Sequence, residues 1–202
     1  MIVYVETNFI LELVFHQQQF ETCNLLLNLC ETGKISLVTP AYSLIEPNEK
    51  LVRQASERKE LQERLDNEIR QLIRTAPYAA RISHLREIGQ LLIKSNEENQ
   101  QRFTEYRKRF LDAVEIITLT KQILQIGADY ETSFSLSPQD GIILASIITH
   151  LDQNSTGDES CFLNQDIGDF NTSSIVSELA QYNCRMIYRF DHGLSFVQSR
   201  LS

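Results

Sequence analysis

The sequence predicts an α/β fold in which a central, mainly parallel sheet is flanked by helices. β-Branched and aromatic runs at 2–6 and from Cys161 onward are typical of buried strands, and segments with helical periodicity lie between such runs. Strands that alternate with helices in this way indicate a parallel sheet. Both of these strands end in acids, the first at Glu6 and the late one at Asp166 and Asp169. Acids in this position are typical of a site at the carboxyl ends of the strands.

Length and composition place the chain among soluble globular proteins. Its 202 residues are enough for a single domain over 1–202 with a sizeable core. No apolar run approaches the roughly 18 residues that cross a bilayer, so we expect no membrane partner. The sequence opens with a predicted strand and has no basic n-region, so we expect no signal peptide. The four cysteines form no CxxC pair and are expected to be reduced core residues, neither metal ligands nor a disulfide, in a cytoplasmic protein.

The charges are segregated along the chain. Residues 50–110 carry 14 basic and 9 acidic side chains, a balance of +5, whereas the rest of the chain carries −13. Such asymmetry bears on binding partners and not on the fold. The basic segment suits a surface that follows a nucleic-acid backbone. The alternative is a pair of solvated helices or a dimer face.

Each predicted element rests on a local signal. Thr7 or Asn8 caps the first helix, Pro40 starts the third, and Pro47 kinks that helix. A polar stretch at 95–99 is predicted to be a turn between two helices. The predicted strands are 2–6, 35–39, 116–119, the run from Cys161, and 185–188. The predicted helices are 8–14, 20–30, 40–46, 49–74, 84–93, 101–114, 121–130, 137–150, 173–182 and 191–200.

The clearest helix covers 137–150. Ser137 is a good N-cap, Pro138 suits the first helical position, and Asp140 falls at the third. The residues that follow are apolar almost all round, so this helix is predicted to be buried. By contrast, the charged helices over about 50–110 are predicted to form an insertion in a smaller α/β core.

Five acids share one kind of position, because each lies at the end of a strand or in the helix that follows it. Carboxylates gathered without matching Lys or Arg repel one another, and a hard divalent cation such as Mg²⁺ or Mn²⁺ relieves that cost. Such an ion activates a water and stabilises the oxygens of a phosphodiester. The candidate metal-binding and catalytic residues are Glu6, Glu46, Asp140, Asp166 and Asp169.

The order of these motifs resembles that of the PIN-domain ribonucleases, the family that includes VapC-type toxins. The first strand of that family ends in Asp-Thr-Asn, matched here by Glu6-Thr7-Asn8. A Glu in the helix after the second strand corresponds to Glu46. Asp140-Gly-Ile-Ile-Leu-Ala145 matches the Asp that opens a buried helix, and Asn164-Gln-Asp-Ile-Gly-Asp-Phe170 matches the motif after the late strand. The resemblance covers 1–46 and about 116–190.

The resemblance implies a PIN-like fold and a Mg²⁺- or Mn²⁺-dependent endoribonuclease. A toxin-type role, with a protein antitoxin or a homodimer as partner, is a further implication. Asn8 would orient Glu6. Two departures matter: Glu6 extends the expected Asp carboxylate by one methylene, which could shift the ion, alter the metal preference or abolish activity. Asn164 replaces a hydroxyl residue that would orient ligands or water.

Plainer interpretations stand beside these. Glu6 and Asp140 also suit helix N-termini for dipole reasons, and Asp166 or Asp169 suits a turn that closes a strand. Glu12 is expected to be a solvated helix residue, and the four histidines show no ligand spacing. The alternative function is a catalytically inactive PIN-like domain that binds RNA or protein. A third candidate function is a metal-dependent phosphoesterase that acts on small substrates.

Overall fold

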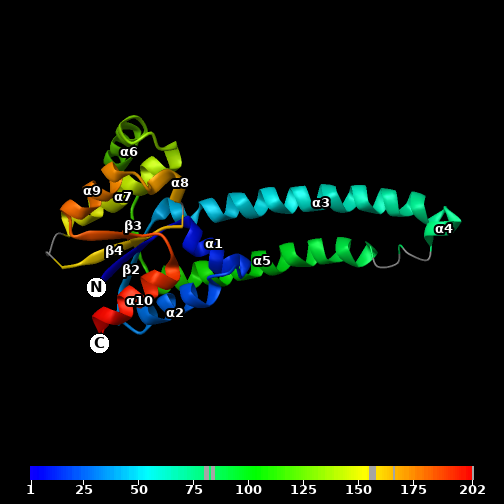
Figure 1. Cartoon of the computed structure of the whole chain (residues 1–202), viewed down its shortest axis with the longest axis horizontal. Helices are drawn as coiled ribbons and strands as arrows, with labels where there is room; N and C mark the ends of the chain where they lie inside the picture. Colours follow the sequence, from blue (N-terminus) through cyan, green and yellow to red (C-terminus); the bar gives the residue numbers. More distant parts are fainter. Residues whose placement is uncertain (80–81, 83–84, 155–157, 166, 202) are drawn as a thin grey trace. The chain divides into compact units, whose positions relative to one another are not determined.

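A computed structural model of the chain describes residues 1–79, 82, 85–154, 158–165 and 167–201. The chain divides into two compact units. The first comprises Met1–Pro47 and Glu105–Ser202, and the second comprises Asn48–Thr104. The first unit holds the sheet and the second consists of helices (Figure 1). None of the described helices combines the length and apolar character that a membrane crossing requires.

The sheet has five strands, all of which pair in parallel, as the sequence predicted. The strand order is β3-β2-β1-β4-β5, with Val5 of β1 opposite Leu163 of β4. The chain therefore builds outward from β1 in one direction and then returns to add β4 and β5 on its other side. The strands are β1 (Ile2–Val5), β2 (Ser36–Pro40), β3 (Glu115–Ile117), β4 (Ser160–Leu163) and β5 (Cys184–Ile187).

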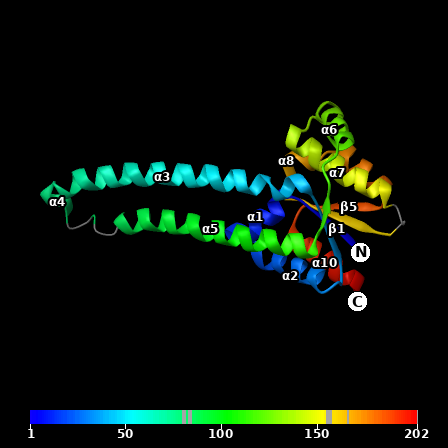
Figure 2. The same ribbon diagram turned by 180° about the vertical axis from the view of Figure 1, so that it is seen from behind.

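Helices cover both faces of this sheet. In Figures 1 and 2, α1, α2 and α10 lie on one side, and α6, α7 and α9 lie on the other. The helices α1 (Thr7–Phe15) and α8 (Ile167–Phe170) leave the carboxyl ends of β1 and β4 for opposite faces of the sheet. The others are α2 (Phe20–Glu31), the 3₁₀ turn η1 (Ala41–Leu44), α3 (Glu46–Ile73), α4 (Ala76–Ala79), α5 (Leu85–Ala113), α6 (Lys121–Ser133), α7 (Pro138–Gln153), α9 (Ser173–Gln181) and α10 (Phe190–Leu201).

Alternation along the strands divides the core into two layers. Tyr4 and Phe162 are buried toward α7, where Leu144 and Ile147 are fully inaccessible. On the opposite face, Phe9 of α1 makes an edge-to-face contact with Phe190, with ring centroids 5.3 Å apart. The four cysteines are all free and buried, as expected.

Two predicted boundaries were wrong. The segment after Pro40 forms only a 3₁₀ turn, and a new helix begins at Glu46, so Pro47 lies in the first turn of α3 instead of kinking a helix. Proline is tolerated there because the first N–H groups of a helix have no intrahelical partner. The polar stretch 95–99 is also not a turn: α5 continues through it without a break.

Contacts within the second unit explain the continuity of α5. The guanidinium of Arg58 in α3 donates to Ser95 Oγ at 3.0 Å and to Asn96 Oδ1 at 2.8 Å. Asn99 is buried and accepts from Arg102 at 2.5 Å. Polar residues that would end an isolated helix are therefore used as contacts between two long helices.

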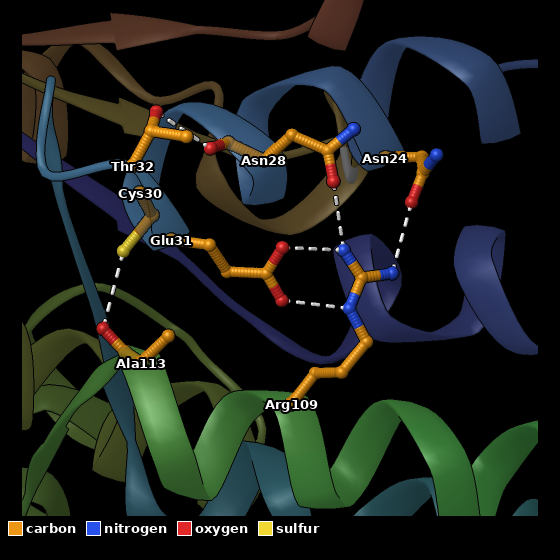
Figure 3. A network of polar contacts seen from close by, with 7 residues as sticks. All are labelled: Asn24, Asn28, Cys30, Glu31, Thr32, Arg109 and Ala113. Atoms are coloured by element: carbon orange, nitrogen blue, oxygen red, sulfur yellow. Dashed lines mark hydrogen bonds and ion pairs between the residues drawn. The ribbon is translucent and has the colours of Figure 1, made fainter.

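Arg109 connects the last turns of α5 to α2 inside the first unit (Figure 3). Its Nε and Nη2 atoms donate to the two carboxylate oxygens of Glu31 at 2.7 and 2.8 Å, and its Nη atoms also donate to Asn24 and Asn28. The guanidinium carbon lies 5.2 Å from the ring centroid of Tyr106. The same guanidinium lowers the pKa of Glu31. This contribution to stability is therefore present above the ordinary Glu pKa and is lost as the pH falls below it.

We expect Arg109→Lys to lower the free energy of unfolding by about 1–3 kcal/mol, because an ammonium cannot reproduce the fork that binds Glu31 and both asparagines. Urea denaturation at neutral pH measures the loss. Arg107→Lys, an exposed substitution on the same helix, is the control and should change stability by less than about 0.5 kcal/mol. Equal effects of the two substitutions would contradict the assigned role.

Helix α7 approaches α6 closely at two glycines. A Cβ atom on Gly141 would lie 2.6 Å from the backbone oxygen of Gly127, a contact that no side-chain movement can relieve. This approach fixes the first turn of α7, where Asp140 lies. Gly141→Ala should therefore lower the free energy of unfolding by about 1–3 kcal/mol through overpacking. Thermal unfolding beside Gln139→Ala, an exposed neighbour, measures the difference. An unchanged melting temperature for Gly141→Ala would show that the two helices can separate at no cost.

Candidate active site

Glu6 lies at the end of the central strand and forms the N-cap of α1. Its backbone is extended, with φ −130° and ψ −169°, and its Oε2 accepts from the backbone N–H of Asn8 at 2.9 Å. The cap is therefore Glu6, and not Thr7 or Asn8 as predicted. The residue is only 4% exposed, and its other oxygen, Oε1, is buried with no hydrogen-bond partner among the described residues. A buried carboxylate oxygen in this state is costly unless a cation or a proton occupies it.

The electrostatic environment of Glu6 disfavours its charge. Burial is the main cause that raises its pKa from 4.5 to about 8, and the nearby carboxylates of Glu46 and Asp140 raise it further. Hydrogen bonds from Asn8 act in the opposite direction but do not outweigh burial. Glu46 and Asp140, two further acids of the predicted five, thus lie close enough to act on Glu6. At neutral pH, Glu6 holds a proton unless a positive charge stabilises the carboxylate.

Glu46 is positioned by Thr7. Because the chain turns through η1 directly after β2, Glu46 is the first residue of α3, and its Oε2 accepts a short hydrogen bond from Thr7 Oγ1. Thr7 is buried beside Glu6. This contact connects the carboxyl ends of β1 and β2. From the sequence, Thr7 was predicted only as a possible helix cap, and no local pattern indicated its contact with Glu46.

Asp140 occupies the third position of α7, as predicted. Its backbone N–H donates to Ser137 Oγ at 3.2 Å, and the same hydroxyl lies 2.5 Å from Asp140 Oδ2. Ser137 is therefore the N-cap that the sequence indicated, with Pro138 in the first turn. The local geometry shows the plainer role of an N-terminal acid, while the effect on the pKa of Glu6 shows that Asp140 is also near that carboxyl group.

The segment after β4 starts beside Glu6, because Val5 and Leu163 are opposite one another. Asn164 is fully buried there, and its backbone N–H donates to the carbonyl of Ile187 at 3.0 Å. Asp166 lies outside the described residues. Asp169 belongs to α8, and its side chain is also outside the described part of the structure.

A divalent cation fits part of this arrangement. The donor set consists of hard carboxylate oxygens, and Glu6 Oε1 is a buried oxygen that lacks a partner among the described residues. Within the described ranges, however, no three His, Cys, Asp or Glu side chains are grouped closely enough to hold an ion. The described residues show Glu6 with two further carboxylates, those of Glu46 and Asp140, near enough to raise its pKa.

The environment of Glu12 differs from the one that the sequence predicted. Glu12 was predicted to be solvated, but it is 5% exposed, and its Oε2 accepts from the backbone N–H of Gln19 at 2.9 Å. The turn after α1 folds back on the helix and covers Glu12.

His150, to which the sequence analysis assigned no role, forms two hydrogen bonds. Its Nδ1 lies 2.9 Å from Tyr4 Oη, and its Nε2 lies 3.0 Å from Glu115 Oε1. This relay joins β1, α7 and β3.

In metal-free protein, the free energy of unfolding should fall as the pH rises between about 4.5 and about 8. The sign follows because folded Glu6 binds its proton more tightly than the unfolded chain does, so deprotonation favours unfolding. One such group contributes a slope of up to about 1.4 kcal/mol per pH unit.

Chemical denaturation with EDTA across this pH range measures the slope, and Glu6→Gln should remove the Glu6 contribution. Glu21→Gln, on the exposed side of α2, should leave the wild-type slope in place. A Glu6→Gln profile parallel to the wild-type profile would contradict the raised pKa.

The sequence was compared with known protein families, curated proteins and solved structures. The family model described as the PIN domain matches residues 3–170, a range that contains Glu6, Glu46 and Asp140 and runs through the helices at 50–110. No curated protein and no solved structure matches the chain.

Proposed function

We propose that this chain, which belongs to the PIN-domain family, is a metal-dependent endoribonuclease. Proteins of this family are generally nucleases that use divalent metal ions and bind RNA. The observation that carries the proposal is the buried Oε1 atom of Glu6, which has no described partner and lies in the field of two further carboxylates. A carboxylate in this position costs stability, and binding of a cation offsets that cost.

Mg²⁺ or Mn²⁺ is the ion that this donor set suits. Glu6, Glu46 and Asp140 would hold it, together with Asp166 or Asp169 from the segment after β4. When bound, such an ion activates a water and stabilises the oxygens of the phosphodiester during displacement.

Neighbouring groups orient the carboxylates. Thr7 Oγ1 holds Oε2 of Glu46, Ser137 Oγ holds Oδ2 of Asp140, and the N–H of Asn8 holds Oε2 of Glu6. Each contact engages one carboxylate oxygen. These contacts limit the rotation of each carboxylate, and Glu6 Oε1 is the oxygen that lacks a partner among the described residues.

Glu6 makes the N-cap contact that an Asp would also make. Its Oε2 accepts from the N–H of Asn8 and caps α1, while Oε1 has no partner among the described residues. Glu6 would thus combine helix capping with ligation. We propose Asn164, buried at the end of β4, as the residue that takes the place of the hydroxyl group expected there.

The finer features implied by the resemblance are proposals of the same kind. They are a toxin-type component, a protein antitoxin or a second copy as partner, and a cytoplasmic location. Within a single domain, the helices at about 50–110 would form an insertion. Their positive balance of charge suits contact with the backbone of an RNA substrate.

An inactive PIN-like domain that binds RNA or protein is the second candidate. It is favoured by the absence of a three-ligand group among the described residues and by the engagement of Asp140 with Ser137, which a helix cap alone would explain. The two candidates differ in their need for metal. An inactive protein would lose nothing on Asp140→Asn beyond a change in stability.

The test is cleavage of a mixed single-stranded RNA by purified protein with Mn²⁺ or Mg²⁺. Cleavage should require the ion and stop with EDTA. Asp140→Asn and Glu46→Gln should each reduce the rate by at least about a hundred-fold, because each removes a charged ligand. Asp129→Asn, an exposed acid on α6, is the matched control and should cleave like the wild type.

Folding of each variant is checked by circular dichroism. No cleavage by folded wild-type protein with either ion would overturn the enzyme and leave the binding module. Cleavage that persists in Asp140→Asn would instead place the chemistry outside the proposed residues.

A further inference from the structure

A polar pocket lies where the turn between α1 and α2 meets the chain after β4. Its volume is about 630 Å³. One wall belongs to α1, the helix that Glu6 caps, and the other comes from the residue two positions beyond β4, the strand next to β1. The pocket therefore opens at the same edge of the sheet as the candidate active site. It is lined by Glu12, His16, Gln17, Gln18, Gln19 and Gln165.

The walls of this pocket are held by hydrogen bonds that backbone N–H groups donate. Glu12 Oε2 accepts from the N–H of Gln19, and the carbonyl of Glu12 accepts from the N–H of Gln17 at 3.1 Å. The side-chain oxygen of Gln19 accepts from the N–H of Asp191 at 3.0 Å, which fastens the turn to the start of α10. The pocket is thus formed before any ligand binds, so binding does not have to order the turn.

The chemistry of the lining favours a nucleobase over a phosphate. Neither Lys nor Arg is among the residues that line the pocket, and its acidic residue is the buried Glu12. Amide side chains offer both donors and acceptors, as the edge of a base requires. The exposed imidazole of His16 lies against the ring of Phe20, with centroids 4.0 Å apart, and adds a flat surface for stacking.

We propose that this pocket binds a guanine base of the RNA, from a nucleotide next to the one that is cleaved. The proposal rests on the proposed nuclease function. Guanine presents two adjacent donors, N1–H and N2–H, which a carboxylate accepts together, and its O6 accepts from a glutamine amide. Adenine and cytosine present one amino donor on the same edge and lack this pair. Glu12 accepts N1–H through Oε1 and N2–H through Oε2, the oxygen that also keeps the N–H of Gln19. Gln165 donates to O6.

Binding can be measured without cleavage. The protein carries Asp140→Asn and is kept in EDTA, and the probes are three fluorescein-labelled RNA hexanucleotides of uridine with a single central guanosine, adenosine or cytidine. Fluorescence anisotropy gives the dissociation constants. We expect the guanosine probe to bind about ten-fold more tightly than the other two, the discrimination that one bidentate contact supplies. Glu12→Gln should reduce this preference to less than about two-fold.

Two further variants separate recognition from folding. Because Glu12 is buried, its replacement can also affect folding, so a second pocket variant is made at the half-buried Gln165. Gln165→Ala should weaken binding of the guanosine probe more than binding of the adenosine probe. Gln125→Ala, exposed on α6, is the control and should keep the full preference.

Equal binding of the three probes, or a preference that survives both pocket variants, would overturn the guanine pocket without affecting the cleavage result. A guanosine preference in a protein that does not cleave RNA would support the pocket and overturn the nuclease.

Discussion

The candidate site is organised around a carboxylate buried at the end of the central strand. Glu6 is only 4% exposed, one of its oxygens caps α1, and the other has no partner among the described residues. Burial and two neighbouring acids raise its pKa to about 8. A fold selected for stability alone would place a neutral cap there, since Ser, Thr or Asn satisfies the same N–H groups without a desolvation cost. The energetic cost at this position is the strongest physical argument that it serves chemistry.

Strand order explains why acids distant in the sequence meet at this position. The chain leaves β1 for one face of the sheet and leaves β4 for the other, and the two strands are neighbours. A crevice forms at the carboxyl ends of strands where such connections diverge. Glu6 and Asn164 follow directly after these two strands, and Glu46 follows the neighbouring β2. The close approach of α7 to α6 then fixes Asp140 on the remaining side.

The parts of the fold that depend on local patterns could be predicted from the sequence. The parallel sheet followed from strands alternating with helices, and the start of α7 followed from Ser137 and Pro138, because capping acts over a few residues. Features that depend on distant contacts could not be predicted. The helix through 95–99 relies on contacts from α3, and the burial of Glu12 relies on the turn that folds back over it. The Thr7–Glu46 contact likewise joins two strands whose adjacency no local pattern reveals.

The double use of Glu6 has an evolutionary consequence. A residue that is both a helix cap and a costly buried acid is retained only while selection for chemistry outweighs its cost to stability. Once that selection ends, replacement by a neutral cap removes the cost of the buried charge. Position 6 should therefore be among the first residues of the site to drift in descendants that keep only a scaffold role. Its identity in such chains would separate decayed copies from working ones.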